Sequence, residues 1–318
     1  MHMADALVAP PVAISAGVIS AFMIALSSQK VSKSGRNDIV PMMGVLGAFV
    51  FAAQMINFSI PGTGSSGHII GGILLASMLG PWAAYITLSS VLIIQCLVFA
   101  DGGLMALGCN LLNMGVMSCL VGYPFIYRPI AGKSLSRTRI MTASIAGCII
   151  ALELGALLVT AETTISGITE LPARDFLLLM IPIHFVIGLC EGIATGAIIC
   201  FVSAYKPDML YSRSIETQEE KRRMSKKTIV LLSVFAVAAL FMAVTYTFIA
   251  SDNPDGLEWS ILNLTGATEI GDSMMPPTAI MPDYDSSFSG IVGGAIVVIT
   301  LWAVSALIFR KRRKECIN

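Results

Sequence analysis

Charged residues are scarce in this chain. Asp, Glu, Lys and Arg make up 13% of its 318 residues, whereas a soluble globular domain carries roughly 25%. Hydrophobic residues make up 55% of the chain, and the mean hydropathy is +0.80. A composition this poor in charge and this rich in apolar side chains excludes an ordinary soluble protein.

The chain also lacks the sequence signatures of common catalytic and redox sites. None of its seven cysteines belongs to a CxxC pair, and six lie within apolar runs, so we expect small buried side chains rather than disulfides or a zinc site. Gly132-Lys133-Ser134 resembles the end of a P-loop, but Tyr127 stands where the first glycine of that loop belongs. We find no HExxH sequence and no serine or cysteine triad. The sequence therefore predicts a protein that is not an enzyme, and uphill transport by it would need an ATPase partner.

Long apolar runs separated by short polar segments dominate the rest of the sequence. A spanning helix needs about 20 mostly apolar residues to cross hydrocarbon about 30 Å thick. The predicted spans are 12–27, 41–58, 82–100, 104–126, 140–162, 175–204, 228–250 and 288–309. A shorter run, 69–80, would measure only about 18 Å as a helix, so it is either a short helix inside the bundle or half of a re-entrant pair. We count it as an inward leg, which predicts an all-α polytopic membrane helical bundle of about seven legs plus a two-span C-terminal module.

The basic residues assign an orientation to this bundle. Short cytoplasmic loops of membrane proteins are enriched in Lys and Arg. Of the 20 Lys and Arg residues, all but Arg174 fall in four segments: 30–36, 128–139, 206–227 and 310–314. If these segments are cytoplasmic, the N-terminus lies outside and the C-terminus lies inside.

The basic segment 206–227 divides the chain into two predicted domains. Residues 1–205 form a compact bundle with short connections, and residues 228–318 form the two-span module. The outer loop of this module, 251–287, contains seven acidic residues and no Lys or Arg.

The start of the chain and one loop histidine together suggest a metal site. His2 and His68 both fall on the predicted outer side, and a large residue at position 2 should leave Met1 in place with a free amine. The Met1 amine, the His2 amide nitrogen and His2 Nδ1 then close a five- and a six-membered ring on one metal, and His68 can fill the fourth position. Four nitrogens in a plane suit Ni(II) first, and also Cu(II) or Co(II), rather than Zn(II) or Mg(II). The alternative is that His2 is an incidental polar residue on a frayed terminus.

Amide and acidic side chains accompany this candidate site. Gln54 and Asn57 end a span just before the Gly/Ser-rich loop that carries His68. They either make interhelical hydrogen bonds or fix the His68 tautomer and hold the N-terminal segment. Asp101 either caps a helix or anchors the N-terminal segment, and we expect Asn110 and Asn113 to share that anchoring role.

Three ionisable residues fall within apolar spans, where such groups are costly and by default functional. They are Glu153, His184 and Glu191. His184 and Glu191 are seven residues apart and therefore share a helix face. A buried mutual pair with a structural role is favoured over a path for metal.

Small residues recur at every fourth position of the first span. They are Ala13, Gly17, Ala21 and Ala25. Such a ladder permits close helix approach, either inside the bundle or against a partner membrane subunit.

Three segments of the sequence resemble one family. They are Met1-His2-Met3-Ala4-Asp5-Ala6-Leu7, QMINFSIPGTGSSGHIIGG (54–72) and ADGGLMALGCNLLNMGV (100–116). Over roughly residues 1–205 the chain resembles the CbiM/NikM family, the substrate-binding membrane components of energy-coupling-factor nickel and cobalt importers. The family holds its metal with the terminal amine, the residue-2 amide and imidazole, and a loop histidine, which implies Met1, His2 and His68 here. Asp5-Ala6 stands where many members have Glu-Gly, and an extra small residue precedes Gly67. These differences keep the ligands but leave the choice between nickel and cobalt open.

A second resemblance concerns the C-terminal module. Asn253-Pro254-Asp255-Gly256-Leu257-Glu258-Trp259-Ser260 is similar to the PDGLE segment of the small two-span auxiliary component of these importers. The resemblance implies a fusion whose outer loop contacts the outer face near the metal site and promotes loading. It also implies a prokaryotic cytoplasmic membrane, transmembrane coupling and ATPase subunits as partners, nickel or cobalt as transported substrate, and neither a cofactor nor nucleic acid.

Two other functions stay open on the residues alone. A self-sufficient secondary divalent-metal transporter would use Glu153, His184 and Glu191 as a proton or ion path. Uptake by this chain alone into proteoliposomes with a proton gradient would reveal it. An intramembrane metalloenzyme would need an open coordination position for water, and four planar nitrogens leave only weak axial sites.

Overall fold

The structure is a computed structural model that describes residues 1–34, 36, 39–132, 136–214, 224–268, 279–281 and 287–315. Several sequence predictions fall outside these residues. They concern Lys133 and Ser134 of the P-loop-like segment, Lys221, Arg222 and Arg223 of the basic linker, Cys316, and residues 269–278 and 282–286 of the acidic loop.

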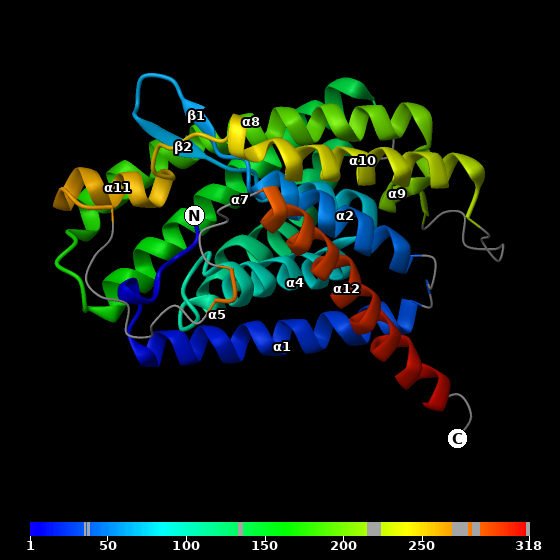
Figure 1. Cartoon of the computed structure of the whole chain (residues 1–318), viewed down its shortest axis with the longest axis horizontal. Coiled ribbons are helices and arrows are strands. Elements are labelled where there is room, and N and C mark those ends of the chain that lie inside the picture. Colours follow the sequence, from blue (N-terminus) through cyan, green and yellow to red (C-terminus); the bar gives the residue numbers. More distant parts are fainter. Residues whose placement is uncertain are drawn as a thin grey trace.

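Long helices running roughly along one axis make up the fold (Figure 1). The long helices are α1 (Pro10–Ser34), α2 (Ile39–Gln54), α4 (Pro81–Phe99), α7 (Arg137–Ser166), α8 (Ala173–Tyr205), α10 (Lys226–Ile249) and α12 (Ser287–Glu315). A further long helix is continuous through α5 (Leu107–Asn110), η2 (Leu111–Tyr127) and α6 (Arg128–Ala131), with wide π-type turns over η2. Among the described residues, seven helices are long and apolar enough to cross a membrane, and the 16-residue α2 is a shorter apolar helix. The predicted all-α multi-pass bundle is confirmed.

The short run at 69–80 forms a small helix buried within the bundle. Helix α3 (Gly72–Leu79) has eight residues, all of them buried. Gly71 and Gly80 bound it with φ values of 78° and 87°, which side chains other than glycine rarely adopt. Pro81 then starts α4 directly. Helix α3 is therefore a short, fully buried packing element inside the bundle.

A β-hairpin replaces the end of one predicted span. The predicted helix 41–58 ends at Gln54. Strands β1 (Phe58–Ile60) and β2 (Ser65–Gly67) then pair antiparallel, with Phe58 opposite Gly67. The glycines at 62 and 64 take positive φ in the connecting turn, which allows the chain to reverse and to place residue 68 back inside the bundle.

The C-terminal module packs on the same bundle. Helices α10 and α12 lie against α2, where a Cβ at Gly47 would come within 2.6 Å of Leu301 Cδ1. The rings of Phe49 and Phe235 meet edge-on with centroids 5.1 Å apart. The PDGLE-like segment starts helix α11 (Gly256–Thr265), where Asp255 and Glu258 form a complete capping box.

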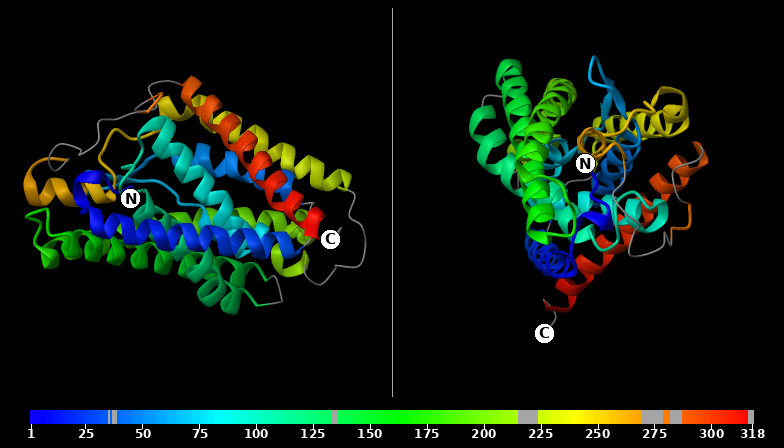
Figure 2. Two further views of the ribbon diagram at one scale, coloured as in Figure 1. Left: turned by 90° about the horizontal axis from the view of Figure 1, so that it is seen from below. Right: turned by 90° about the vertical axis from the view of Figure 1, so that its left-hand side faces the viewer.

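Different elements of the chain lie at the two ends of the bundle. The N-terminus, the hairpin and α11 gather at one end, whereas η3 (Pro207–Met209), α9 (Tyr211–Ser214) and the C-terminal part of α12 lie at the other (Figures 1 and 2). The segments that the sequence assigned to the outer side therefore lie together.

The small-residue ladder of α1 is only partly used inside the bundle. Ala13 is buried, and a Cβ at Gly108 would come within 2.4 Å of the Gly17 nitrogen. Ala21 and Ala25 are exposed. The N-terminal half of the ladder therefore packs against α5. The C-terminal half, with Ala21 and Ala25, faces away from the part of the chain that the structure describes.

Candidate metal centre

The first residues of the chain are threaded into the bundle. Met1 and Met3 are 4% and 0% exposed. The Met3 N–H donates to Asn110 Oδ1 at 2.7 Å, and Asn110 Nδ2 donates back to the Met3 carbonyl at 3.2 Å. Asn113 Nδ2 lies 3.4 Å from the Met3 sulfur and 2.7 Å from Glu162 Oε2. The terminus is thus a fixed internal segment, and both asparagines contact it.

Asp5 and Gly103 lock the far end of this segment. Asp5 Oδ1 accepts hydrogen bonds from the Met105 and Ala106 N–H groups at 2.8 and 3.0 Å, and the Gly103 N–H donates to the Met3 carbonyl. A Cβ at Gly103 would lie 1.9 Å from Asp5 Oδ1 and 2.4 Å from the Asp5 nitrogen. Only glycine allows this approach.

We therefore expect Gly103→Ala to displace the N-terminal segment and weaken metal binding at least roughly tenfold, the range seen when residues that support a metal site are changed. Gly17→Ala is the matched control, because its Cβ meets no atom within 4 Å. Titration of both purified variants with Ni(II) measures the difference. Equal affinities would show that the packing of Gly103 against Asp5 does not position the terminus.

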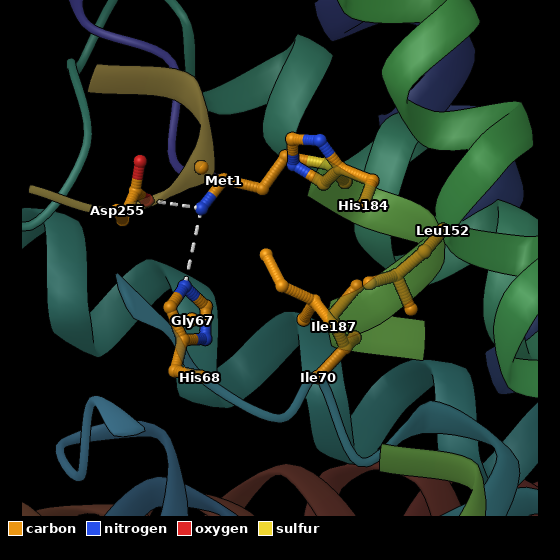
Figure 3. Close-up of a pocket in the computed structure, with 9 residues that line it drawn as sticks. Met1, Gly67, His68, Ile70, Leu152, His184, Ile187 and Asp255 are labelled. Atoms are coloured by element: carbon orange, nitrogen blue, oxygen red, sulfur yellow. Dashed lines mark hydrogen bonds and ion pairs between the residues drawn. The ribbon is translucent and has the colours of Figure 1, made fainter. Parts of the chain in front are cut away.

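The Met1 amine sits between two side chains from distant parts of the chain. It lies 3.2 Å from His68 Nε2 and forms a short ion pair with Asp255 (Figure 3). Asp255 is the cap of α11 in the C-terminal module, so this module contacts the first atom of the chain.

His2 lies beside His68 and faces Asp101. The two imidazole centroids are 5.2 Å apart, with 17° between the ring planes. His2 Nδ1 is 3.0 Å from Asp101 Oδ1, so binding of a metal through Nδ1 requires the ring to leave this contact. Of the two roles considered for Asp101, this contact with His2 favours anchoring of the N-terminal segment. A helix cap is not favoured, because the following helix begins only at Leu107.

The charges around the amine are set by burial and by one another. Burial lowers the pKa of His2 and lowers that of His68 well below its usual value, and the Met1 ammonium lowers the pKa of His68 further. Both rings are therefore neutral at pH 7 and keep a lone pair. Burial opposes ionisation of Asp255, but the Met1 ammonium outweighs it and pulls the pKa of this carboxyl well below its ordinary range.

The loop behind His68 is held by buried side chains. Gln54 Nε2 donates to the Ile70 carbonyl at 2.8 Å. The Glu191 carboxylate accepts from the Ile70 and Gly71 N–H groups, each at 2.9 Å. These bonds fix the backbone that carries His68, so Gln54 acts on the loop rather than on the imidazole.

The expected pairing of His184 with Glu191 is wrong. Glu191 binds the backbone after His68, and His184 Nδ1 lies 2.8 Å from the Met180 carbonyl. Seven residues along a helix place two side chains on one face but about 10 Å apart along the axis, which leaves each to find its own partner. Both oxygens of Glu153 are buried without a hydrogen-bond partner among the described residues.

Hydrogen bonds to main-chain groups in and next to the hairpin hold the C-terminal module. The Ser66 N–H donates to the Pro254 carbonyl at 2.8 Å, and Trp259 Nε1 donates to the Thr63 carbonyl at 2.9 Å. The carbonyl of Asn57 accepts from the Ser251 N–H at 2.8 Å. Asn57 therefore serves the contact between the two modules through its backbone.

Side chains alone do not make a metal site in the described part of the chain. No group of three or more His, Cys, Asp or Glu residues there is placed to hold an ion. The nitrogens that meet there are the Met1 amine and His68 Nε2, with the His2 ring stacked beside that of His68. Main-chain nitrogens therefore have to supply part of any coordination sphere at this centre.

Three acidic contacts were not predicted from the sequence. They join Asp255 to the Met1 amine, Asp5 to the Met105 and Ala106 N–H groups, and Glu162 to Asn113. The capping box of Asp255 and Glu258 could have indicated the start of a helix, but no local sequence pattern links any of the three carboxylates to its distant partner.

Family comparisons match most of the chain. Residues 2–209 match a family model described as "Cobalt uptake substrate-specific transmembrane region" (CbiM), and residues 229–310 match the PDGLE domain. A protein of Archaeoglobus fulgidus, provisionally named fused nickel transport protein NikMN, is 32% identical over 294 residues, covering 91% of this chain and 94% of its own. The fused nickel transport protein NikMN of Rhodobacter capsulatus is 28% identical over 234 residues, covering 70% of this chain and 67% of its own.

Two solved structures of transition metal transporters also align with this chain. The crystal structure of a transition metal transporter aligns with a TM-score of 0.54 and 31% identity, covering 69% of this chain and 99% of its own. A truncated transition metal transporter aligns with the same TM-score and 32% identity, over 65% of this chain and 99% of its own.

Proposed function

Because this chain belongs to the CbiM family and carries a PDGLE domain at its C-terminal end, we propose that it captures Ni(II) or Co(II) on the outer side of a prokaryotic cytoplasmic membrane and passes it inward. It does so as the substrate-specific component of an ATP-driven energy-coupling-factor importer, together with a transmembrane coupling subunit and ATPase subunits. The names of two relatives support nickel as the substrate, and the description of the matching family model supports cobalt.

One observation carries this proposal. The free amine of Met1 is buried against His68 Nε2, with the His2 ring nearly parallel to that of His68. In a square-planar complex with metal–nitrogen bonds of about 2.0 Å, neighbouring nitrogens lie about 2.8 Å apart. The 3.2 Å between the amine and His68 Nε2 is close to that spacing. This spacing supports the amine and His68 Nε2 as neighbouring ligands of one metal ion.

The charge of Asp255 suits the site both before and after metal binding. The ammonium contributes one positive charge next to this carboxylate. A divalent metal that displaces a proton from the amine and one from the His2 amide also leaves one net positive charge there. Asp255 can therefore neutralise either state, so metal enters with little change in the electrostatic energy of this contact.

Exchange of one metal for two protons makes binding strongly dependent on pH. We expect the apparent affinity for Ni(II) to fall by about a hundredfold for each pH unit of acidification in the range where the amine is protonated, since metal binding releases protons from its ligands. Calorimetry in buffers of different ionisation enthalpy counts the protons released. A release of two protons per metal supports the amine–amide chelate, and a release close to zero contradicts it.

The outer position of the N-terminus and the inner position of the C-terminus remain part of this proposal, and they rest on the distribution of Lys and Arg. The exposed inner half of the ladder on α1, with Ala21 and Ala25, is the proposed contact for the coupling subunit. The C-terminal module is proposed to promote loading by holding the Met1 amine in place through Asp255.

A further inference from the structure

His184 carries a buried imidazole lone pair that has no protein partner. Its side chain is 1% exposed. Nδ1 lies 2.8 Å from the Met180 carbonyl, and since a carbonyl only accepts, Nδ1 must carry the proton. Nε2 then presents a lone pair, and it has no hydrogen-bond partner among the described residues.

His184 lines the pocket that Met1 and His68, two of the proposed metal ligands, also line. His184, Met1, His68 and Asp255 line one small pocket. Figure 3 shows His68 and His184 approaching Met1 from different sides. The His184 ring also lies close to Gly256, where an added Cβ would come within 3.2 Å of Cε1. His184 therefore faces the same space as the N-terminal chelate, from helix α8.

The arrangement has the features of a metal-binding histidine. A ligating imidazole usually donates its second ring N–H to a carbonyl or carboxylate, which fixes the tautomer and the ring orientation. A buried acceptor left without a partner is unfavourable, so a group that coordinates Nε2 stabilises the pocket. Neutral imidazole is a ligand that suits Ni(II) and Co(II).

We propose that His184 Nε2 is a second, transient ligand for the transported divalent metal and receives the ion as the chelate of Met1, His2 and His68 opens. This inference rests on the proposed function and adds to it a second ligand in the same pocket. Its ligand class is a borderline first-row divalent cation, bound through one fixed imidazole and water or neighbouring donors of the pocket.

Co(II) binding to full-length variants with a disabled primary site tests this role. In the His68→Ala background we expect weak residual Co(II) binding. Adding His184→Gln should reduce that residual affinity by roughly tenfold or more. Adding Leu152→Ala, which enlarges the same pocket without removing a donor, should change it by less than about threefold. Residual binding that survives His184→Gln, or that Leu152→Ala reduces equally, overturns the proposal.

A second background guards against misfolding of His68→Ala. A chain with two residues added before Met1 keeps every side chain and disables the amine instead, and His184→Gln should have the same effect in it. In the otherwise unchanged chain, His184→Gln should slow metal uptake by the assembled importer by roughly tenfold. If the unchanged chain failed to bind Ni(II) through Met1, the proposed function would fall, and the comparison in the two disabled backgrounds would still report on His184.

Discussion

Two residues added in front of Met1 should abolish high-affinity Ni(II) binding while the helical bundle stays folded. A single added residue is avoided because it would place the histidine third from a new free amine, which by itself offers four planar nitrogens to Ni(II). The two added residues turn the Met1 amine into an amide, which removes a ligand and breaks the chelate that depends on it. They also have to fit where the amine now meets His68 and Asp255 in a buried site. The loss should exceed the roughly 10–100-fold that changes around a metal site cost, and calorimetric titration with Ni(II) measures it.

The control for this change is the same chain with a removable extension. Proteolytic removal that regenerates Met1 as the first residue should restore full binding, and circular dichroism should be alike in both forms. Equal Ni(II) affinity before and after removal would show that the amine is not a ligand.

Asp255→Asn should weaken Ni(II) binding about 10–100-fold. The substitution leaves the buried ammonium without its counter-ion, and breaking one side of a buried ion pair costs about 3–5 kcal/mol. The N-terminal segment then leaves its site in the absence of metal, so that metal binding has to drive it back. The same titration detects the loss, and proteolysis of the released N-terminus reports the undocking.

Asp252→Asn is the matched control for the charge. It lies three residues earlier in the same loop and is exposed, so it changes the net charge equally and should leave the affinity unchanged. If Asp252→Asn and Asp255→Asn behaved alike, only the overall charge of the loop would matter, and the specific contact with Met1 would have no role in binding.

The sequence predicted those structural elements that are determined by residues close together in the chain. The apolar runs located the spanning helices because hydrocarbon demands a continuous apolar stretch. The predicted span 41–58 extended past the end of α2 at Gln54, because Phe58 and Ile60 are as apolar as the residues of that helix. The hairpin follows from positive φ at Gly62 and Gly64, and a Gly/Ser-rich loop alone does not specify the strand pairing on either side of it.

The candidate site divides in the same way. Chelate geometry singled out Met1, His2 and His68, and the structure brings these three residues together. The contact of Asp255 with Met1 joins residues 254 positions apart, and the bonds from Glu191 to the backbone after His68 join residues about 120 apart. Contacts of this kind depend on how the two modules and the helices pack, which no spacing within one segment encodes.

The coordination of Ni(II) in the full chain with its own N-terminus tests the central claim most directly. X-ray absorption and optical spectroscopy of the purified protein with one equivalent of Ni(II) give the ligands and their geometry. The account predicts a diamagnetic, four-coordinate planar ion bound by nitrogen atoms, and loss of that spectrum in His68→Ala. A six-coordinate, oxygen-rich ion, or an unchanged spectrum in His68→Ala, would contradict it.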